Sequence, residues 1–330
     1  MIEVEWERRL HQAGSDAGLA SHAGGVVVHE RNTRVVCLDP VDGAVRWDVP
    51  VGRWPRAIVV AGSRCLVLPQ DTDRLVCLDF GTGEVVWQAD LRPYTGHVVV
   101  DGDTVLVGGW RGYTPLRALD TATGRTLWET AHRVHTVRPV AVGAGFLVGE
   151  PGGTSVRVVD RREPREISAW PLPSPLVGDD DEPAFTAVGP DRLVVRCGDH
   201  AVVEVVPATA TVREFAVAGT ALSSSAPQHV GGLLWLRERG TGVTVADARD
   251  GRVRWRVDVG RFPVGRVVPV ESGAGFVLAD GGGTLTRLDP AGRVTGRAAI
   301  SGRVRALRPL GRNRVLALTK GALLAAALTE

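Results

Sequence analysis

Four of the eight histidines, His22, His97, His135 and His229, are the candidates for proton transfer in this sequence. An imidazole gains and loses a proton near neutral pH, so each ring could act as a general acid or base. The repeat described below predicts that all four lie on one end of the strands, near the start of an innermost strand. Rings that converge there would form a catalytic site, whereas an isolated histidine is more often an ordinary hydrogen-bonded or solvated residue.

Aromatic residues close to arginines suggest a second kind of chemistry, the binding of a ligand by stacking. A guanidinium group attracts the face of an aromatic ring, and Trp, Tyr and Arg are enriched at binding hot spots. We expect the ligand-binding residues to be Arg53, Trp54, Arg56, Tyr94, Trp110, Arg111, Tyr113, Arg138 and Arg266. In this interpretation the loop aromatics are exposed; the alternative is that Trp54 and Trp110 pack between repeats or cover the mouth of a channel.

Other recognisable chemistry is missing from the sequence. There is no G-x-S-x-G elbow, H-E-x-x-H helix, P-loop or G-x-G-x-x-G turn. The four cysteines show no C-x-x-C spacing, which indicates reduced core thiols in a cytoplasmic protein. The acidic run Asp179, Asp180 and Asp181 lies in a proline-containing loop and fits no EF-hand pattern, so no metal is expected.

The charge balance gives no reason to expect a nucleic acid or a membrane as partner. Lys and Arg total 39 against 37 for Asp and Glu, a formal charge of +2. The start, MIEVEWERRL, is charged, and the apolar run ALLAAAL is much shorter than the roughly 20 residues of a membrane helix. We therefore expect a soluble, cytoplasmic protein.

An internal repeat determines the expected architecture. The segments VCLDPVDGAVRW, VCLDFGTGEVVW, RALDTATGRTLW and TVADARDGRVRW each read as a strand, an Asp-to-Gly turn and a second strand that carries Trp. With weaker copies, the marker positions of the repeat are Trp6, Trp47, Trp87, Trp128, Trp170, Phe215, Trp255 and Gly296. The spacing of about 41 residues, with two further strand-like runs before each hairpin, is typical of a propeller blade.

The two ends of the sequence complement each other. GALLAAALTE supplies a third strand without a fourth, and EVEWERRL supplies a fourth strand without the first three. Pairing them would complete the last unit and leave no free edge in the ring. The prediction is an all-β, eight-bladed β-propeller of four-stranded antiparallel blades, closed by the N-terminal strand in the last blade, as a single domain over residues 1–330.

The run ALDTATGRTLW resembles the tryptophan-docking repeat of the PQQ-like (quinoprotein-type) β-propellers, with Ala118, Asp120, Thr123, Gly124 and Trp128 at the motif positions. The other repeats match it in part, and the resemblance covers essentially the whole chain. It implies that the repeated Trp is a structural wedge between blades. The family's quinone dehydrogenases carry adjacent cysteines, which are missing here, so no PQQ or other cofactor is expected. Its outer-membrane assembly lipoproteins need an export signal and a lipidated cysteine, which we do not find.

Two functions remain open at this point. The first is a scaffold that binds a small-molecule, peptide or protein ligand on its loop face, around Trp54, Tyr94, Trp110 and Tyr113. The second is a non-redox enzyme, such as a cyclase, lyase or hydrolase, that uses the four histidines and nearby arginines at the mouth of the central channel. Convergence of the histidine rings would favour the enzyme.

Overall fold

The computed structural model is built almost entirely of β-strands. It describes residues 2–11, 16–22, 24–143, 145–178, 184–217, 219–259, 263–270, 275–300, 302–311 and 313–328. Within these ranges the helical elements are three single-turn 3₁₀ helices, η1 (Asp16–Gly18), η2 (Trp110–Gly112) and η3 (Pro207–Thr209). None of the described helices is long and apolar enough to cross a membrane.

The chain divides into two compact units. Unit 1 consists of Met1–Gln88, Gly240–Val243 and Trp255–Glu330, and unit 2 of Ala89–Arg239 and Thr244–Arg254.

Eight four-stranded antiparallel sheets, the blades of an eight-bladed β-propeller, form the fold, as the repeat predicts. Four of them contain the strands β1 (Ile2–Arg9), β30 (Val304–Pro309), β31 (Arg314–Thr319) and β32 (Ala322–Leu328); β2 (Leu19–His22), β3 (Gly25–Glu30), β4 (Arg34–Leu38) and β5 (Val45–Pro50); β6 (Pro55–Ala61), β7 (Arg64–Pro69), β8 (Arg74–Asp79) and β9 (Val85–Asp90); and β26 (Pro263–Val270), β27 (Gly275–Asp280), β28 (Thr284–Leu288) and β29 (Val294–Ala299).

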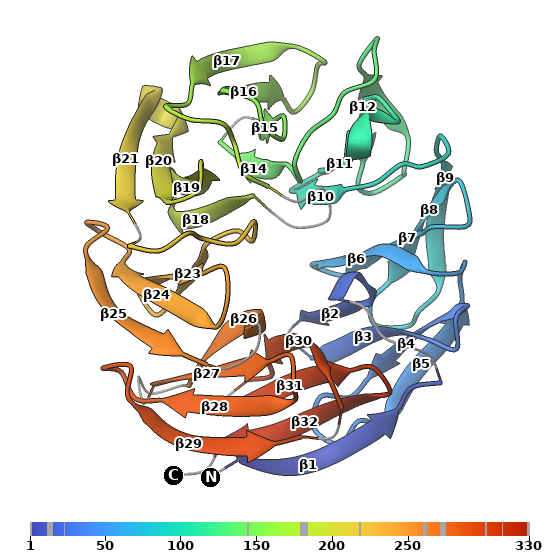
Figure 1. Ribbon diagram of the computed structural model, residues 1–330. Coiled ribbons are helices and arrows are strands. Elements are labelled where there is room, and N and C mark those ends of the chain that lie inside the picture. Colours follow the sequence, from blue (N-terminus) through green and yellow to red (C-terminus); the bar gives the residue numbers. More distant parts are fainter. Residues whose placement is uncertain are drawn as a thin grey trace. The chain divides into compact units, whose positions relative to one another are not determined.

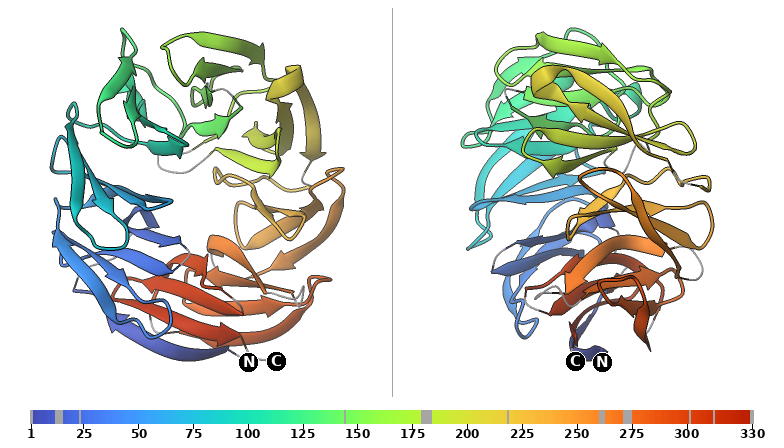
Figure 2. Two further views of the ribbon diagram at one scale, coloured as in Figure 1. Left: turned by 180° about the vertical axis from the view of Figure 1, so that it is seen from behind. Right: turned by 90° about the vertical axis from the view of Figure 1, so that its left-hand side faces the viewer.

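The other four sheets contain the strands β10 (Val98–Asp101), β11 (Thr104–Gly108), β12 (Leu116–Asp120) and β13 (Thr126–Glu129); β14 (Val140–Val142), β15 (Gly145–Gly149), β16 (Ser155–Asp160) and β17 (Glu166–Pro171); β18 (Phe185–Gly189), β19 (Arg192–Cys197), β20 (Ala201–Val206) and β21 (Thr211–Val217); and β22 (Gln228–Val230), β23 (Leu233–Arg237), β24 (Gly242–Asp247) and β25 (Val253–Asp258). Within unit 2 the first strands of successive sheets contact each other, β10 with β14 and β18 with β22 (Figure 2).

The N-terminal strand completes the sheet formed by the C-terminal strands. β1 pairs antiparallel with β32, from Ile2 opposite Leu328 to Arg9 opposite Ala322. Figure 1 shows β1 lying along β32, with the two chain ends next to each other. This pairing confirms the closure expected from the complementary ends of the sequence.

Burial explains why the strands differ in composition. The second strands β7, β11 and β15 are almost continuously buried, because both of their faces are covered by protein. The fourth strand β5 is instead exposed or half-buried along its length except at Trp47, which is buried. The repeated Trp is therefore the residue with which an otherwise half-exposed outer strand joins the core.

Four of the repeated Trp residues, Trp6, Trp47, Trp128 and Trp255, dock onto the turn between the third and fourth strands of the next sheet. The indole Nε1 donates a hydrogen bond to the backbone carbonyl that follows the turn Asp, in the pairs Trp6–Pro40 (3.3 Å), Trp47–Phe80 (2.8 Å) and Trp128–Arg161 (2.9 Å). The ring packs on the turn glycine so closely that a Cβ there would lie 2.4–2.9 Å from it, in the pairs Trp6–Gly43, Trp47–Gly83 and Trp255–Gly292. These contacts confirm the structural role that the resemblance implies for Trp.

The sheet β18–β21 departs from this arrangement on both sides. Its turn is η3 instead of an Asp-to-Gly turn, and Ala210 there adopts a left-handed φ of 51°. The buried Trp170 of the preceding sheet keeps an Nε1 without a hydrogen-bond partner. Phe215 occupies the Trp position of this sheet, and its side chain has no N–H to donate.

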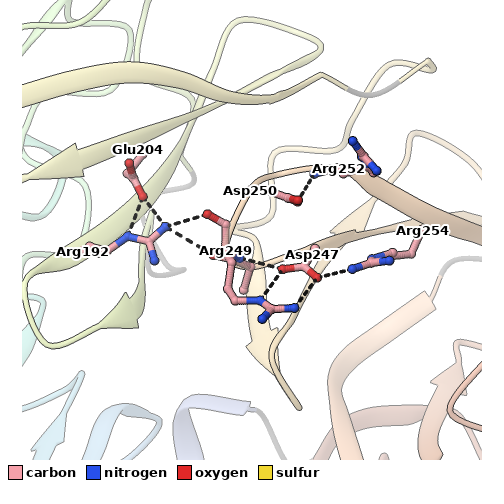
Figure 3. Close-up of polar contacts among 8 residues, drawn as sticks. Arg192, Glu204, Asp247, Arg249, Asp250, Arg252 and Arg254 are labelled. Atoms are coloured by element: carbon pink, nitrogen blue, oxygen red, sulfur yellow. Dashed lines mark hydrogen bonds and ion pairs between the residues drawn. The ribbon is translucent and has the colours of Figure 1, made fainter.

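Arg192 makes the hydrogen bonds that Phe215 cannot make. Its guanidinium donates to the carbonyls of Ala248 (3.4 Å) and Arg249 (3.3 Å), directly after the turn residue Asp247 of the next sheet. Figure 3 shows Arg192 reaching from Glu204 to this turn. The side chain of Glu204 is only 2% exposed, and Arg192 and Arg213 both pair with it. A buried ion pair and a guanidinium thus replace one docked indole.

The outer strands share a second feature, a β-bulge. Six of them, β1, β5, β13, β17, β21 and β29, shift register by one residue against the neighbouring third strand. The extra residues are Glu5, Arg46, Leu127, Ile167, Phe215 and Thr295. A bulge increases the local twist and interrupts the row of backbone hydrogen-bonding groups along a strand.

Candidate binding surface

Three loops of unit 2 carry most of the aromatic and basic residues that the sequence analysis selected. They are residues 91–97 between β9 and β10, residues 109–115 between β11 and β12, and residues 130–139 between β13 and β14. All three leave the same end of their sheets, opposite the Asp-to-Gly turns. Loops held by rigid strands are common places for binding residues.

Backbone hydrogen bonds lock the three loops together. The N–H of Gly108 donates to Gly96 O (2.8 Å), and the N–H of Thr136 donates to Gly109 O (2.9 Å). The buried ring of His97 adds a contact of 3.1 Å from its Nε2 to Thr136 O. The loops therefore form one ordered body, which fixes the side chains they carry.

An aromatic cluster lies on this body. The rings of Tyr94 and Tyr113 are 5.5 Å apart and tilted by 55°, and the edge of Trp110 meets Tyr113, also at 5.5 Å. The guanidinium of Arg111 covers the Trp110 ring at 4.5 Å, a cation–π contact. His135 lies beside Gly112, whose added Cβ would be 3.5 Å from that of His135. We call Tyr94, Trp110, Arg111, Tyr113 and His135 the aromatic loop surface.

The outer rings of this surface are exposed, and the inner ring is not. Tyr94 is 68% and Tyr113 is 45% exposed, whereas Trp110 is only 5% exposed. The expectation that Trp110 is an exposed aromatic is therefore wrong. Its indole packs on Gly96, where a Cβ would lie 2.5 Å from the Trp110 Cβ, and the ring contacts the exposed Tyr113.

Unfavourable backbone conformations occur in two of the three loops. Eight described non-glycine residues have positive φ, and three of them are Tyr94 (62°), His97 (54°) and Arg111 (49°). A left-handed conformation costs an L-residue about 1 kcal/mol or more, and such residues cluster at functional sites. In these loops the unfavourable conformation is adopted by residues that carry an aromatic ring, an imidazole and a guanidinium.

The charges of the three loops are all of one sign. Residues 91–97, 109–115 and 130–139 contain no acidic residue and the basic residues Arg92, Arg111, Arg133 and Arg138, together with His97, His132 and His135. Arg92 pairs with Glu129 of β13 at 2.6 Å. Burial of Glu129 opposes its ionisation, but hydrogen bonds from Arg117 and Arg92 outweigh this, and its pKa is lowered. One carboxylate outside the loops thus offsets part of their positive charge.

The predicted residues Arg53, Trp54 and Arg56 belong to unit 1. Trp54 is 55% exposed with a φ of 48°, and its carbonyl accepts a hydrogen bond from Gln70 N (2.7 Å). The N–H of Arg53 donates to Asp71 Oδ1 (2.5 Å). Trp54 thus stands on a tightly held loop of its own, and Arg56 is half-buried in β6.

The four candidate histidines occupy different environments. His97 and His135 lie in the loops of unit 2. His22 lies at the end of β2, where its ring meets Phe80 at 5.8 Å, and not near the start of the strand as expected. The reason is that β2 already begins at Leu19, so His22 reaches the turn end of the sheet. His229 is the middle residue of the short strand β22 and contacts Ala187 O through Nδ1 (3.1 Å).

Two further predictions concern single basic and acidic residues. Arg138 is half-buried and donates to Val98 O (3.4 Å). Arg266 belongs to β26, but its side chain lies outside the described residues, as does the acidic run 179–181.

The cysteines and the other side chains that bind metals show no clustering in the part of the chain that the structure describes. Within the described ranges, no group of three or more His, Cys, Asp or Glu side chains could hold a metal ion. The cysteines are buried, free and not adjacent in sequence, and burial raises the pKa of the Cys37, Cys77 and Cys197 thiols to about 11. Protonated, buried thiols are poor nucleophiles and poor ligands.

Sequence reasoning missed the residue on which the aromatic surface rests. Gly96 carries no ring or charge, but only a glycine leaves room for the Trp110 ring. The signal was present in the run Tyr94-Thr95-Gly96-His97, where a glycine follows a loop tyrosine and lies two residues before β10 begins at Val98.

The comparisons with known proteins agree on the fold. A family model described as outer membrane protein assembly factor BamB matches residues 3–93, 71–170 and 153–324. A search of curated proteins found no match.

Among solved structures, BamB from Moraxella catarrhalis is 18% identical with a TM-score of 0.77, over 99% of this chain and 100% of that chain. The computationally designed Ika8 protein is 16% identical with a TM-score of 0.76, over 98% of both chains. A europium-containing methanol dehydrogenase is 13% identical with a TM-score of 0.70, over 99% of this chain and 93% of that chain. At these identities the similarities show the fold alone, but the family model spans most of the sequence. The chain therefore belongs to the PQQ-like β-propeller family whose model is described as outer membrane protein assembly factor BamB.

Proposed function

We propose that the chain is a binding scaffold that holds a protein or peptide partner on the aromatic loop surface. The observation that carries this proposal is the pair of exposed tyrosines, Tyr94 and Tyr113, on three interlocked loops. Tyr and Trp provide large contact areas at a small cost in side-chain entropy, and Arg is the third residue type enriched at hot spots. The family model's description as an assembly factor also supports a partner that is a protein.

The exposure of the rings favours a macromolecular partner over a small molecule. A small-molecule site usually encloses 70–90% of its ligand in a concave pocket. Tyr94 and Tyr113 instead stand 68% and 45% exposed, so a partner that brings its own surface would bury them. Their tilted contact and the support from Trp110 hold them ready for such a partner, which lowers the entropy lost on binding.

Binding is favoured over catalysis because the candidate histidines have separate contacts. His97 meets the carbonyl of Thr136, His229 that of Ala187, and His22 the ring of Phe80. A catalytic base is held by its neighbours so that it points toward a reacting atom. The described contacts of these three rings each belong to a different sheet or loop.

The proposal is tested by photo-cross-linking in the cells that express the chain. A photoreactive phenylalanine analogue replaces Tyr94 in one variant and the exposed Ile167 of the outer strand β17 in a control variant. We expect a specific protein adduct at position 94 that is lost when Tyr113→Ala is added, and no such adduct at position 167. Equal adducts at both positions, or none at position 94, would contradict the proposal.

We also propose a cytoplasmic location, which the four free, buried cysteines support. Cell fractionation with an antibody against the chain tests it. Recovery in a membrane or periplasmic fraction would contradict this part of the proposal.

A further inference from the structure

We infer that the partner segment on the aromatic loop surface is acidic: an extended peptide with carboxylate side chains on both sides of an aromatic or other apolar anchor. This inference rests on the proposed function and adds the chemistry of the partner. Three independent features of unit 2 carry it.

The first feature is the distribution of charge. The whole chain is close to neutral, with a formal charge of +2, but the three loops have four arginines, three histidines and no acidic residue. Arg92 is paired with Glu129 and Arg138 is half-buried, whereas Arg111 and Arg133 are exposed on loops that are hydrogen-bonded to one another, so these two charges face the same partner. Complementary potentials speed encounter and exclude partners of like charge.

The second feature is the position of Arg111. Its guanidinium lies 4.5 Å over the Trp110 ring, next to Tyr113, and the residue is exposed with a left-handed backbone. Stacking fixes the plane of the guanidinium, and a planar guanidinium can meet a carboxylate with two parallel hydrogen bonds. A carboxylate bound there would place the neighbouring side chain of the peptide at the tyrosine pair.

The third feature is the packing of the rings, which favours a peptide over single-stranded nucleic acid. Nucleic acids bind by stacking successive bases on open ring faces along a basic groove. Here Tyr94 and Tyr113 tilt against each other by 55°, and Arg111 covers a face of Trp110. These faces are already used within the cluster, while the exposed parts of the two tyrosines suit an apolar side chain between flanking charges.

The inference is tested with fluorescein-labelled synthetic peptides and the purified full chain. One peptide has two glutamates on each side of a central phenylalanine, a second has glutamines in their place, and a third has lysines. Fluorescence anisotropy is measured at about 0.01 M and about 0.15 M salt, between which the screening length falls from roughly 30 Å to 8 Å. We expect the glutamate peptide to bind best, and to bind less tightly at the higher salt concentration.

Five variants separate charge from aromatic contact. Arg111→Gln and Arg133→Gln should each weaken binding of the glutamate peptide about two- to five-fold. Tyr94→Ala should weaken it about ten-fold. The matched control Arg252→Gln removes an exposed arginine from a turn at the opposite end of the sheets and should leave binding of the glutamate peptide unchanged. Circular dichroism of each variant verifies its fold, and Arg111→Lys, which keeps the charge, should retain the salt dependence.

Three results would overturn the inference. They are equal binding of the glutamine and glutamate peptides, no measurable binding of the glutamate peptide, and displacement of that peptide by a uridine oligonucleotide or an anionic vesicle at a lower concentration. None of them bears on the adduct at position 94, which tests the proposed function separately.

Discussion

Replacing Arg192 by methionine tests whether a guanidinium has taken over the role of a docked indole. Methionine keeps a similar apolar stem, so the loss is that of the guanidinium's contacts, which include the Phe215 ring at 5.8 Å. Arg192 Nε lies 2.7 Å from Glu204 Oε1, and its terminal nitrogen reaches the same oxygen at 2.5 Å and the carbonyls of Ala248 and Arg249 at 3.4 and 3.3 Å.

The expected cost follows from the burial of Glu204. Its side chain is 2% exposed, so in the variant the carboxylate depends on Arg213, whose own side chain is 58% exposed. Removing one partner of a buried pair costs about 3–5 kcal/mol, and hydrogen bonds to charged groups contribute about 1.5–3 kcal/mol each. Because Arg213 remains, we expect the low end, a loss of about 3 kcal/mol in the free energy of unfolding.

Urea unfolding followed by circular dichroism measures this loss. At a slope of about 3 kcal/mol per M, the midpoint should fall by about 1 M. The matched control is Arg249→Met, because Arg249 pairs with Asp247 while its side chain is 84% exposed, and exposed pairs contribute about 0–1 kcal/mol. Similar small losses in both variants would refute the reasoning, because Arg192 would then be no more than a surface cation.

Three further predictions concern turns, indoles and pH. Gly83→Ala should cost about 3 kcal/mol or more in unfolding free energy, and Gly62→Ala only about 1 kcal/mol. Both glycines have positive φ, but only at Gly83 would the new Cβ meet a docked indole, at 2.8 Å. Urea unfolding of the two variants checks this difference. Trp170→Phe should destabilise less than Trp128→Phe, because the Trp170 N–H is buried without an acceptor whereas that of Trp128 donates at 2.9 Å; equal losses would contradict the assignment. Burial opposes the ionisation of Glu204, but its two arginines lower its pKa overall. The stabilisation that ionised Glu204 contributes is therefore present above the unfolded pKa of about 4.3 and is lost as the pH falls through the folded pKa. Glu204→Gln should flatten the acid side of the stability–pH curve, which urea unfolding at several pH values measures.

The fold could be predicted because its signal is repeated. One strand order agrees with the Trp spacing, the Asp-to-Gly turns and the two complementary ends of the sequence. The pairing of Ile2 with Leu328 confirms that strand order at the closure of the ring. The irregular sheet could not be foreseen in the same way. Nothing in the sequence links Arg192 to Phe215, because the hydrogen bonds that compensate for the missing indole come from a different strand.

The candidate surface was predictable in its residue types and less so in its geometry. Tyr94 and Tyr113 stood out as the two tyrosines of the chain, both on loops, and the structure brings them together. The burial of Trp110 depends on Gly96, a contact between two loops that spacing does not reveal. His22 was misplaced because an error of a few residues in where a strand begins moves a side chain to the other end of the sheet.

The bulges in the outer strands have a consequence for the chain at high concentration. Each sheet ends in an outer strand, and such an edge can pair with another copy and begin a fibre. The hazard is increased by exposed valines such as Val4, Val45 and Val294 on three of these strands. The extra residue in β1, β5 and β29 interrupts the regular spacing of backbone hydrogen-bond donors and acceptors. A regular strand of another copy can therefore pair with the outer strand on only one side of the bulge. The bulge residue of each outer strand thereby helps to keep crowded copies from polymerising.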